Sequence, residues 1–247
     1  MRVLVTRPGH DADETASRLI ALGHAPLVSP LLEIEYLVGG AVGLDGVQAV
    51  LATSSNGIRA LARRSTRRDI AVYAVGSQTA TEAEAAGYNS VHNAHGDVVA
   101  LADAVRRSVD RKKGRLFHVA GAEADGRLVD ELSRAGYAVE KLELYRAKAK
   151  MALPSDVATA LGRGEIDAVL HFSARSARIF CDLVAQAELE RACTGLVMVC
   201  ISQSAAAPLK ALQFLELRIA REPNQEALLA CLDITLRHHP AGGSRSG

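Results

Sequence analysis

The sequence predicts an α/β protein of two similar lobes, each a five-stranded parallel sheet flanked by helices, joined by a two-stranded antiparallel linker. Short runs rich in Val, Leu and Ala alternate with amphipathic segments along the 247 residues, as is typical of a parallel sheet covered on both faces. One pattern also occurs twice, because Ala49–Gly57 and Ala168–Ser176 both pass from an apolar run into small polar residues. A second pair follows, Tyr73–Ala80 and Met198–Ala205. A repeat of this length predicts two similar halves that face one ligand.

The first strand is expected at Arg2–Thr6, an apolar run that ends before Pro8. Apolar spacing then predicts a helix over Asp11–Leu22. A second strand follows at Ala25–Ser29. Residues 30–36 alternate apolar and charged side chains, which is the pattern of a half-exposed strand.

The alternation of strands and helices resumes at residue 47. Gly87 and Gly136 suit helix C-terminal positions, and Asp97 suits the N-cap of the helix that begins at Val98. The expected elements of this middle region are strand 47–53, helix 55–64, strand 70–75, helix 77–86, strand 89–93, helix 97–109, strand 115–119, helix 124–135 and strand 137–140.

Residues 139–148 alternate apolar and charged side chains again, so we expect them to pair with residues 30–36 in an antiparallel ribbon. The chain then leaves one domain at the first ribbon strand and re-enters it at the second. The remaining expected elements are helix 154–162, strand 166–172, helix 174–187, strand 196–201, helix 203–212, strand 215–220 and helix 224–236. The predicted division is domain 1 at 1–35 with 147–240, domain 2 at 36–146, the linker ribbon at 30–37 and 139–150, and a disordered tail at 241–247.

The composition excludes several classes of function. Lys and Arg total 29 against 28 Asp and Glu, and the net charge of +1 provides no long-range field for nucleic acid or anionic lipid. Aromatic residues make up 4% and Trp is absent, which argues against stacking of single-stranded nucleic acid. No apolar run approaches the ~20 residues of a membrane helix, and no secretory signal follows Met1, so we expect a cytoplasmic protein. The four cysteines lack metal-ligand spacing and are expected to be reduced core residues.

The repeated stretches place small residues at the carboxyl ends of the expected strands, where open parallel sheets bind ligands. Small side chains let backbone N–H groups approach an anion, hydroxyls add donors, and helix N-termini favour negative charge. The alternative is that the Ser, Thr and Asn residues are ordinary helix caps. Arg7 follows the first strand, where its guanidinium suits either a carboxylate ligand or a surface position. The candidate ligand-binding residues are Arg7, Ser54, Ser55, Asn56, Gly76, Ser77, Gln78, Thr79, Gly121, Ala122, Ser173, Ser202, Gln203 and Ser204.

Several well-known catalytic motifs are absent from the sequence. There is no GxGxxG after the first strand, no GxxxxGK[ST] and no GxSxG, so dinucleotide, P-loop and hydrolase functions have no support. His92 and His95 have no acidic or Cys companion at ligand spacing, which favours loop histidines over a metal site. His118 and His171 lie in or at the end of apolar strands, where we expect buried imidazoles with satisfied hydrogen bonds.

A set of motifs resembles the uroporphyrinogen-III synthase family over about residues 1–236. The motifs are Val3–Pro8, Thr53–Gly57, Ala74–Ala80, Leu144–Arg146 and Phe172–Ser173, and their order and spacing carry the resemblance. It implies a bilobed, cofactor-free lyase that cyclises the linear tetrapyrrole hydroxymethylbilane, with loss of water and inversion of the last pyrrole ring. It also implies a proton-donor role for the tyrosine of the linker strand, which matches Tyr145. The alternative for Tyr145 is a purely structural residue packed against the ribbon.

The resemblance further implies a monomer whose turns bind the acetate and propionate carboxylates of hydroxymethylbilane, with a transient contact to hydroxymethylbilane synthase as a further expectation. Ser202 departs from the family, which usually has Gly there, so backbone approach to a ligand is expected to be less close. Two other interpretations stay open. A two-lobed small-molecule sensor without catalysis normally has an export signal or a DNA-binding domain, and a flavodoxin-like signalling module needs an acidic pocket for which Asp11 and Asp13 are a poor match.

Overall fold

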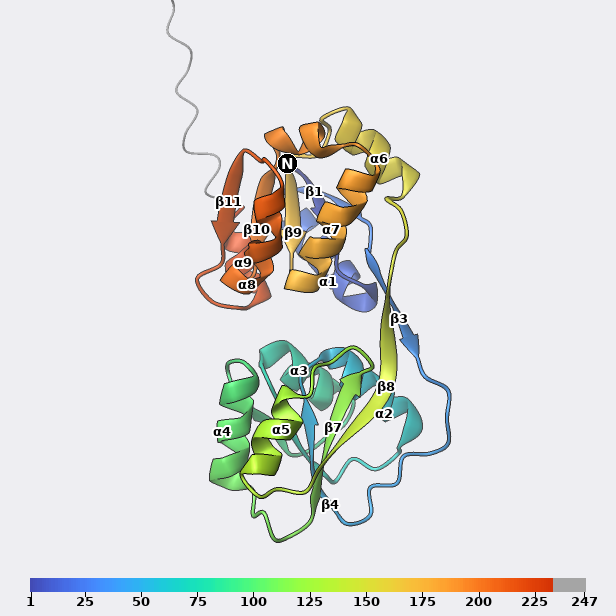
Figure 1. The fold of residues 1–247 in the computed structure, drawn as a ribbon, viewed down its shortest axis with the longest axis vertical. Helices are drawn as coiled ribbons and strands as arrows, with labels where there is room; N and C mark the ends of the chain where they lie inside the picture. The colour runs from blue at the N-terminus through green and yellow to red at the C-terminus, as the bar shows by residue number, and fades with distance from the viewer. Residues whose placement is uncertain (233–247) are drawn as a thin grey trace, which may run out of the picture. The chain divides into compact units, whose positions relative to one another are not determined.

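The computed structural model describes residues 1–232, and these form two compact units (Figure 1). Unit 1 comprises Met1–Glu33 and the chain from Ala149 onward, and unit 2 comprises Ile34–Lys148. The tail expected at 241–247 and the last residues of the helix expected at 224–236 lie outside the described residues. Among the described helices, none has the length and apolar character that a bilayer crossing requires.

Unit 1 is built on a parallel sheet in the order β11-β10-β9-β1-β2. Leu4 of β1 lies opposite Val169 of β9, which lies opposite Met198 of β10. The strands are the apolar runs expected from the sequence, shortened by one or two residues at their ends. The elements are β1 (Arg2–Val5), α1 (Gly9–Ala21), β2 (Ala25–Val28), α6 (Ser155–Gly162), β9 (Ala168–His171), α7 (Ala174–Gln186), η1 (Glu190–Gly195), β10 (Val197–Cys200), α8 (Gln203–Ala206), η2 (Ala207–Ala211), β11 (Glu216–Ile219) and α9 (Gln225–Ala230).

Unit 2 is built on a sheet in the order β3-β8-β7-β4-β5-β6, parallel from β8 to β6. When β3 is set aside, this order repeats that of unit 1, with β4 in the central place of β9 and β7 in the place of β1. The elements are β3 (Leu32–Tyr36), β4 (Val47–Ala52), α2 (Ser55–Arg64), β5 (Ala71–Ala74), α3 (Ser77–Ala85), β6 (Val91–Asn93), α4 (Val98–Ser108), β7 (Arg115–Gly121), α5 (Arg127–Arg134) and β8 (Val139–Ala149).

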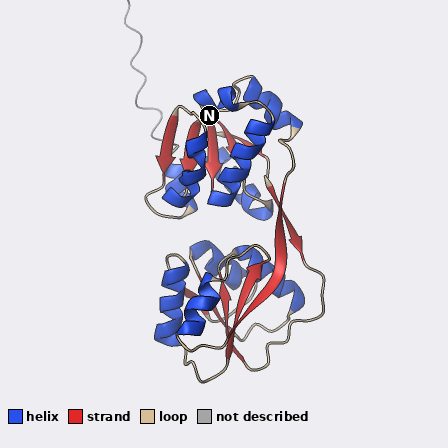
Figure 2. Ribbon diagram, in the orientation of Figure 1, coloured by secondary structure: helices blue, strands red, loops and turns tan. Residues whose placement is uncertain are grey.

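Apolar side chains alternate between the two faces of each sheet, so each unit has a core on both faces. In unit 1, Leu4 and Val169 pack on the face covered by α6 and α7, whereas Val5 and Leu170 pack on the face covered by α1 and α9. In unit 2 the two faces are covered by α2 with α3 and by α4 with α5. Helices lie on both sides of each sheet in Figure 2. The prediction of parallel sheets flanked by helices is therefore confirmed.

Strand β8 corrects the strand count of unit 2. The sequence pattern predicted a short strand at 137–140 and a separate ribbon strand at 139–148, but both belong to β8. One edge of β8 pairs in parallel with β7 and the other edge pairs with β3, so the described residues of this sheet form six strands rather than five. The strand is continuous because nothing in its sequence interrupts extended backbone. Both faces contain exposed and buried positions, with Glu140 and Glu143 exposed and Leu144 and Ala147 buried.

Backbone hydrogen bonds and ion pairs join β3 and β8 along the ribbon. Leu37 N–H donates to the Leu144 carbonyl, and Lys150 N–H donates to the Leu31 carbonyl, each at 2.9 Å. The two strands therefore run in opposite directions.

The basic residues at the end of β8 have acidic partners across the ribbon. Lys148 Nζ lies 2.8 Å from Glu35, and this contact lowers the pKa of the Glu35 carboxyl. Lys150 lies 4.0 Å from Glu33. All four side chains are exposed to water, so these pairs favour the strand register more than they stabilise the fold.

Several helix boundaries differ from the expectations. The helix expected at 203–212 is divided into α8 and the 3₁₀ helix η2, because Pro208 has no N–H to continue the α-helical hydrogen bonds. Helix α5 begins at Arg127, three residues later than expected, and η1 was not expected. The expected cap is confirmed, since Asp97 accepts hydrogen bonds from the first turn of α4. Gly87 and Gly136 follow their helices with φ of +91° and +85°, values that favour glycine.

Candidate functional site

Two turns of unit 2 lead from the carboxyl ends of adjacent strands into helices. Ser54 follows β4 and is the N-cap of α2, and its hydroxyl accepts a hydrogen bond from Asn56 N–H at 3.1 Å. Gly76 follows β5 and is the N-cap of α3, without a side-chain cap. The first N–H groups of an α-helix have no partner within the helix, and the helix dipole is positive at that end. The start of α3, with Ser77 and Gln78 exposed, therefore has the features of a carboxylate-binding turn.

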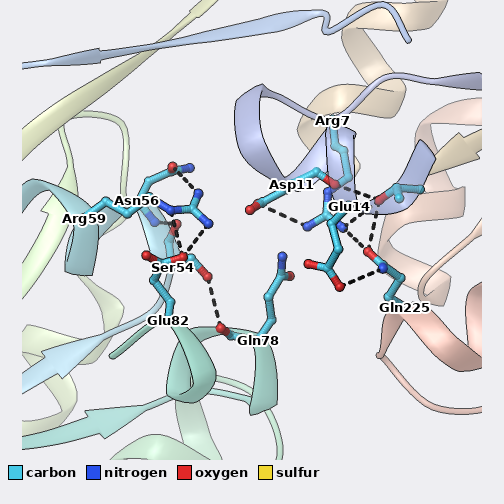
Figure 3. A network of polar contacts seen from close by, with 11 residues as sticks. Arg7, Asp11, Glu14, Ser54, Asn56, Arg59, Gln78, Glu82 and Gln225 are labelled. Atoms are coloured by element: carbon cyan, nitrogen blue, oxygen red, sulfur yellow. Dashed lines mark hydrogen bonds and ion pairs between the residues drawn. The ribbon is translucent and has the colours of Figure 1, made fainter. Parts of the chain in front are cut away.

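A polar network holds these two helices together (Figure 3). Arg59 of α2 donates through Nε to Glu82 of α3 at 2.8 Å and through Nη1 to Asn56 Oδ1 at 3.3 Å. Ser55 Oγ donates to the Gln78 carbonyl at 3.4 Å. The side chains of Arg59 and Glu82 are only 15% and 22% exposed, so solvent screens their attraction less than it does at an open surface. The network fixes the spacing of the Ser54 and Gly76 turns.

Tyr145 lies opposite Gly121 at the carboxyl end of β7. A Cβ atom at Gly121 would lie 2.9 Å from Cε2 of the tyrosine ring, so the ring rests against the glycine backbone. Ala122 N–H donates to the Tyr145 carbonyl at 2.9 Å. The ring is partly buried against the core that Leu144 also joins. The structure thus brings the tyrosine next to Gly121 and Ala122, two of the candidate ligand-binding residues.

Two residues that were not candidates fasten the segment after β7 to β8. Lys141 Nζ donates to the Ala124 carbonyl at 2.9 Å and to the Ala122 carbonyl at 3.4 Å. The Glu123 carboxylate accepts from Ala147 N–H at 3.3 Å. In the sequence, Lys141 is one of several charges in an alternating strand and Glu123 is an isolated acid in a turn. Neither position carries a motif, so their role becomes visible only through the pairing of β7 with β8.

A buried histidine lies at the same edge of the sheet. His118 Nε2 is 3.1 Å from the Thr53 hydroxyl, a hydrogen bond that links β7 to the end of β4. Burial, and to a smaller extent the nearby Lys141, lower the pKa of His118 to about 4, against an opposing effect of Asp125. Its Nδ1 is buried without a hydrogen-bond partner among the described residues, so the expectation of a satisfied imidazole holds for one ring nitrogen and is wrong for the other. The imidazole is therefore neutral at physiological pH, with one ring N–H.

The unit 1 turns use their serine hydroxyls as helix caps. Ser173 Oγ accepts from Ser176 N–H at 3.1 Å at the start of α7, and Ser202 Oγ accepts from Ala205 N–H at 3.3 Å at the start of α8. Ser202 and Gly76 therefore occupy equivalent N-cap positions, 126 residues apart. The sequence repeat had aligned Ser202 with Ser77, which follows Gly76 by one residue.

Arg7 lies in a buried network of unit 1, shown in Figure 3. It is 6% exposed, and its guanidinium donates to Gln225 Oε1 at 2.6 Å and to Asp11 Oδ2 at 3.2 Å. Thr15 Oγ1 lies 3.4 Å from the guanidinium, and the Phe172 ring packs 4.0 Å below it. These contacts join β1 to α1, α9 and the turn after β9. Of the two positions that the sequence offered for Arg7, a surface position is wrong, because the side chain is buried among internal partners. Binding of a substrate carboxylate stays a prediction.

The other candidates differ in how much of each residue is exposed. Ser55, Thr79 and Gly121 are buried, so their side chains or α-carbons serve packing. Ser54, Asn56, Gly76, Ala122 and Ser202 are half-buried, and the exposed candidates are Ser77, Gln78, Ser173, Gln203 and Ser204.

His171 ends β9 inside the core of unit 1. It is 0% exposed, the Phe180 ring packs edge-on against it at 5.3 Å, and neither ring nitrogen has a hydrogen-bond partner among residues 1–232. The expectation of a satisfied imidazole is therefore wrong here. Burial lowers the pKa of His171 to about 3. The four cysteines are free and buried, as expected, and burial raises the pKa of Cys181, Cys193 and Cys200.

Comparison with known proteins relates this fold to one family. The family model described as uroporphyrinogen-III synthase HemD matches residues 13–230. A uroporphyrinogen-III synthetase from Helicobacter pylori has a similar structure, with a TM-score of 0.64, 19% identity and coverage of 96% of this chain and 100% of that chain. A mutant uroporphyrinogen III synthase from Thermus thermophilus is also similar, with a TM-score of 0.55, 18% identity and coverage of 96% of this chain and 99% of that chain. At these identities the two structures establish a shared fold. No curated protein sequence gives a significant match.

Replacement of His171 by Leu is expected to reduce the pH dependence of stability. The unfolded chain binds a proton with a pKa near 6.5 that the folded chain excludes down to about pH 3, so stability falls as the pH drops below 6.5. Between pH 7 and pH 5 we expect the free energy of unfolding to fall by about 2 kcal/mol more in the wild type than in His171→Leu. The measurement is urea unfolding at both pH values. His92→Asn, a change at an exposed histidine, is the control. Equal losses for wild type and His171→Leu contradict the prediction.

Proposed function

The chain belongs to the uroporphyrinogen-III synthase family, a family of hydro-lyases in tetrapyrrole biosynthesis, and from this we propose how its residues act on the substrate that the family implies, hydroxymethylbilane. The family match over residues 13–230 is the observation that carries the function. The product is uroporphyrinogen III, formed by cyclisation with loss of water and inversion of the terminal pyrrole ring. We also propose that the protein acts in the cytoplasm as a monomer and needs no cofactor.

The turns at the carboxyl edges of the two sheets are the proposed carboxylate sites. Hydroxymethylbilane carries acetate and propionate side chains around its rim, so it offers many anionic groups to backbone N–H donors. In unit 2 the start of α3 is the strongest candidate, because Gly76 contributes no capping side chain and Gln78 is exposed. In unit 1, Gln203 and Ser204 are exposed at the start of α8. Local dipoles of this kind bind anions without a large net charge, which agrees with the chain's +1.

Tyr145 is the proposed proton donor for water loss. The C–O bond of the hydroxymethyl group breaks with electrons supplied by the electron-rich pyrrole, and the departing oxygen needs a hydrogen-bond donor. A phenol carries an O–H donor and serves this purpose. The remaining requirement is a folded substrate that places the last pyrrole for ring closure, and carboxylates held in fixed turns supply that orientation.

The activity is tested with freshly prepared hydroxymethylbilane and separation of the uroporphyrinogen isomers by chromatography. We expect the asymmetric type III isomer in proportion to enzyme concentration. Only the symmetric type I isomer, which forms without enzyme, would refute the assignment and favour a binding protein without catalysis.

Tyr145→Phe is expected to lower kcat by about 10- to 100-fold, because it removes the phenolic proton donor and keeps the ring. The KM is expected to change less than twofold, since the carboxylate contacts stay. Tyr36→Phe is the matched control: Tyr36 is another ribbon tyrosine, and its ring, which packs 3.9 Å from the Arg63 guanidinium, is retained. An unchanged kcat for Tyr145→Phe contradicts the proposed role.

Gln78→Glu is expected to weaken product binding about fivefold, or about 1 kcal/mol, because an added carboxylate of equal size repels a bound carboxylate. An acidic residue in the first turn of a helix is favourable, so the fold is not expected to lose stability. Gln186→Glu makes the same change at the exposed end of α7 and is expected to leave binding unchanged. The measurement is titration of uroporphyrinogen III by calorimetry, and equal affinities for both variants would exclude the α3 turn as a carboxylate site.

A further inference from the structure

We propose that Gly121 is a positioning residue for the reaction. Because glycine has no side chain, it leaves a space, here called the seat, that the Tyr145 phenol occupies and that fixes the position of the ring. This inference rests on the proposed proton-donor role of Tyr145. It gives Gly121 a different role from the one expected from the sequence, which was to let the backbone approach an anion.

The seat is defined by the distances from an ideal Cβ atom at Gly121 to the phenol. These distances are 2.9 Å to Cε2, 3.0 Å to Cζ and 3.3 Å to the hydroxyl oxygen of Tyr145. Carbon atoms in van der Waals contact lie about 3.5–4.0 Å apart, so a methyl group and the ring cannot occupy these positions together. Gly121 is itself buried, and the ring covers it.

The backbone of Gly121 does not need glycine for its own conformation. The glycines with positive φ are other residues, among them Gly114 and Gly136, and Gly121 is not one of them. The conformation is therefore open to any L-residue. The contact with Tyr145 is the steric reason, among the described residues, for glycine at this position.

The Gly121 backbone is also held in place, so a methyl group added at Gly121 would displace the Tyr145 ring rather than the backbone. Ala122 N–H donates to the Tyr145 carbonyl, and Lys141 binds the Ala122 and Ala124 carbonyls. The Glu123 carboxylate accepts from the backbone of β8. Hydrogen bonds on both sides of Tyr145 thus fasten the segment after β7 to β8, whereas the ring turns about two side-chain torsions.

A register shift between β7 and β8 creates the pairing. Ala120 lies opposite Glu143, but the next residue, Gly121, lies opposite Tyr145 instead of Leu144. Irregularities of this kind redirect side chains at the ends of sheets. Leu144 remains buried in the core, and Tyr145 is brought onto the glycine.

Gly121→Ala is therefore expected to affect catalysis more than stability. The methyl group displaces the phenol by up to about 1 Å, and a misplacement of that size costs about 10- to 100-fold in rate. We expect kcat to fall by at least about tenfold, KM to change less than twofold, and the urea midpoint to stay close to that of the wild type. Gly126→Ala is the matched control in the same loop, because the nearest atom to its Cβ, an oxygen of Asp130, is 3.7 Å away.

The test combines a double-mutant cycle with a readout that does not depend on activity. The kcat of wild type, Gly121→Ala, Tyr145→Phe and the double variant is measured with hydroxymethylbilane. If Gly121 acts through the phenol, Gly121→Ala lowers kcat when Tyr145 is present but changes it less than twofold in the Tyr145→Phe background. In parallel, ¹⁹F NMR of the protein labelled with 3-fluorotyrosine reports the Tyr145 resonance, assigned by its loss in Tyr145→Phe. We expect Gly121→Ala to shift it and Gly126→Ala to leave it in place.

The outcomes separate the two proposals. An active wild type with an unaltered kcat in Gly121→Ala, an equal fall in both backgrounds, or an unshifted Tyr145 resonance overturns the role of Gly121. A wild type that forms only the type I isomer refutes the proposed function instead. If Gly121→Ala then still shifts the Tyr145 resonance, the contact between Gly121 and the phenol exists without the reaction.

Discussion

The pairing of β8 with two different neighbours determines where the proposed catalytic residue lies. On one side, β7 supplies a parallel partner that is buried on both faces. On the other side, β8 pairs with β3, the strand through which the chain leaves unit 1, and β8 itself ends where the chain re-enters unit 1. Tyr145 lies near the point where the first pairing ends, opposite the last residue of β7, and the carbonyl of the preceding Leu144 accepts from Leu37 beyond β3. The tyrosine backbone is thus held by a sheet while its ring lies at the sheet's carboxyl edge, where parallel sheets bind ligands.

Within each unit the candidate turns consist mainly of backbone, and the side chains that were candidates as donors have largely structural roles. The hydroxyls of Ser54, Ser173 and Ser202 cap helices, and Arg7 joins four segments of unit 1. These roles are compatible with the proposed binding, because a cap or a buried guanidinium fixes the turn whose N–H groups would face a carboxylate. A chain with a net charge of +1 can then hold a substrate with many carboxylates, since each helix start contributes its own local field.

The sequence predicted the features that depend on short segments. The parallel sheets follow from apolar runs of strand length, and the Asp97 cap follows from one residue and the helix after it. The carboxyl-edge position of the turns was predictable for the same reason. The contact of Gly121 with Tyr145 was not, because it joins residues 24 positions apart through a register shift that no local pattern encodes. The unsatisfied nitrogens of His171 were missed because periodicity predicts burial but not hydrogen-bond partners. The division of the helix at 203–212 was predictable from Pro208, which the apolar periodicity outweighed.

Comparison of the two sheets identifies the position in unit 1 that corresponds to Tyr145. Each sheet has the same strand order around a central strand, and β2 of unit 1 occupies the place of β8. Strand β2 has four residues and ends opposite the last residue of β1, whereas β8 has eleven and continues past the end of β7. Val28 lies opposite the last residue of β1, as Tyr145 lies opposite the last residue of β7, so unit 1 has an apolar side chain at the corresponding place. Both units have the turns proposed to bind carboxylates, but a phenol lies at this strand position in unit 2 alone, because unit 1 has Val28 there.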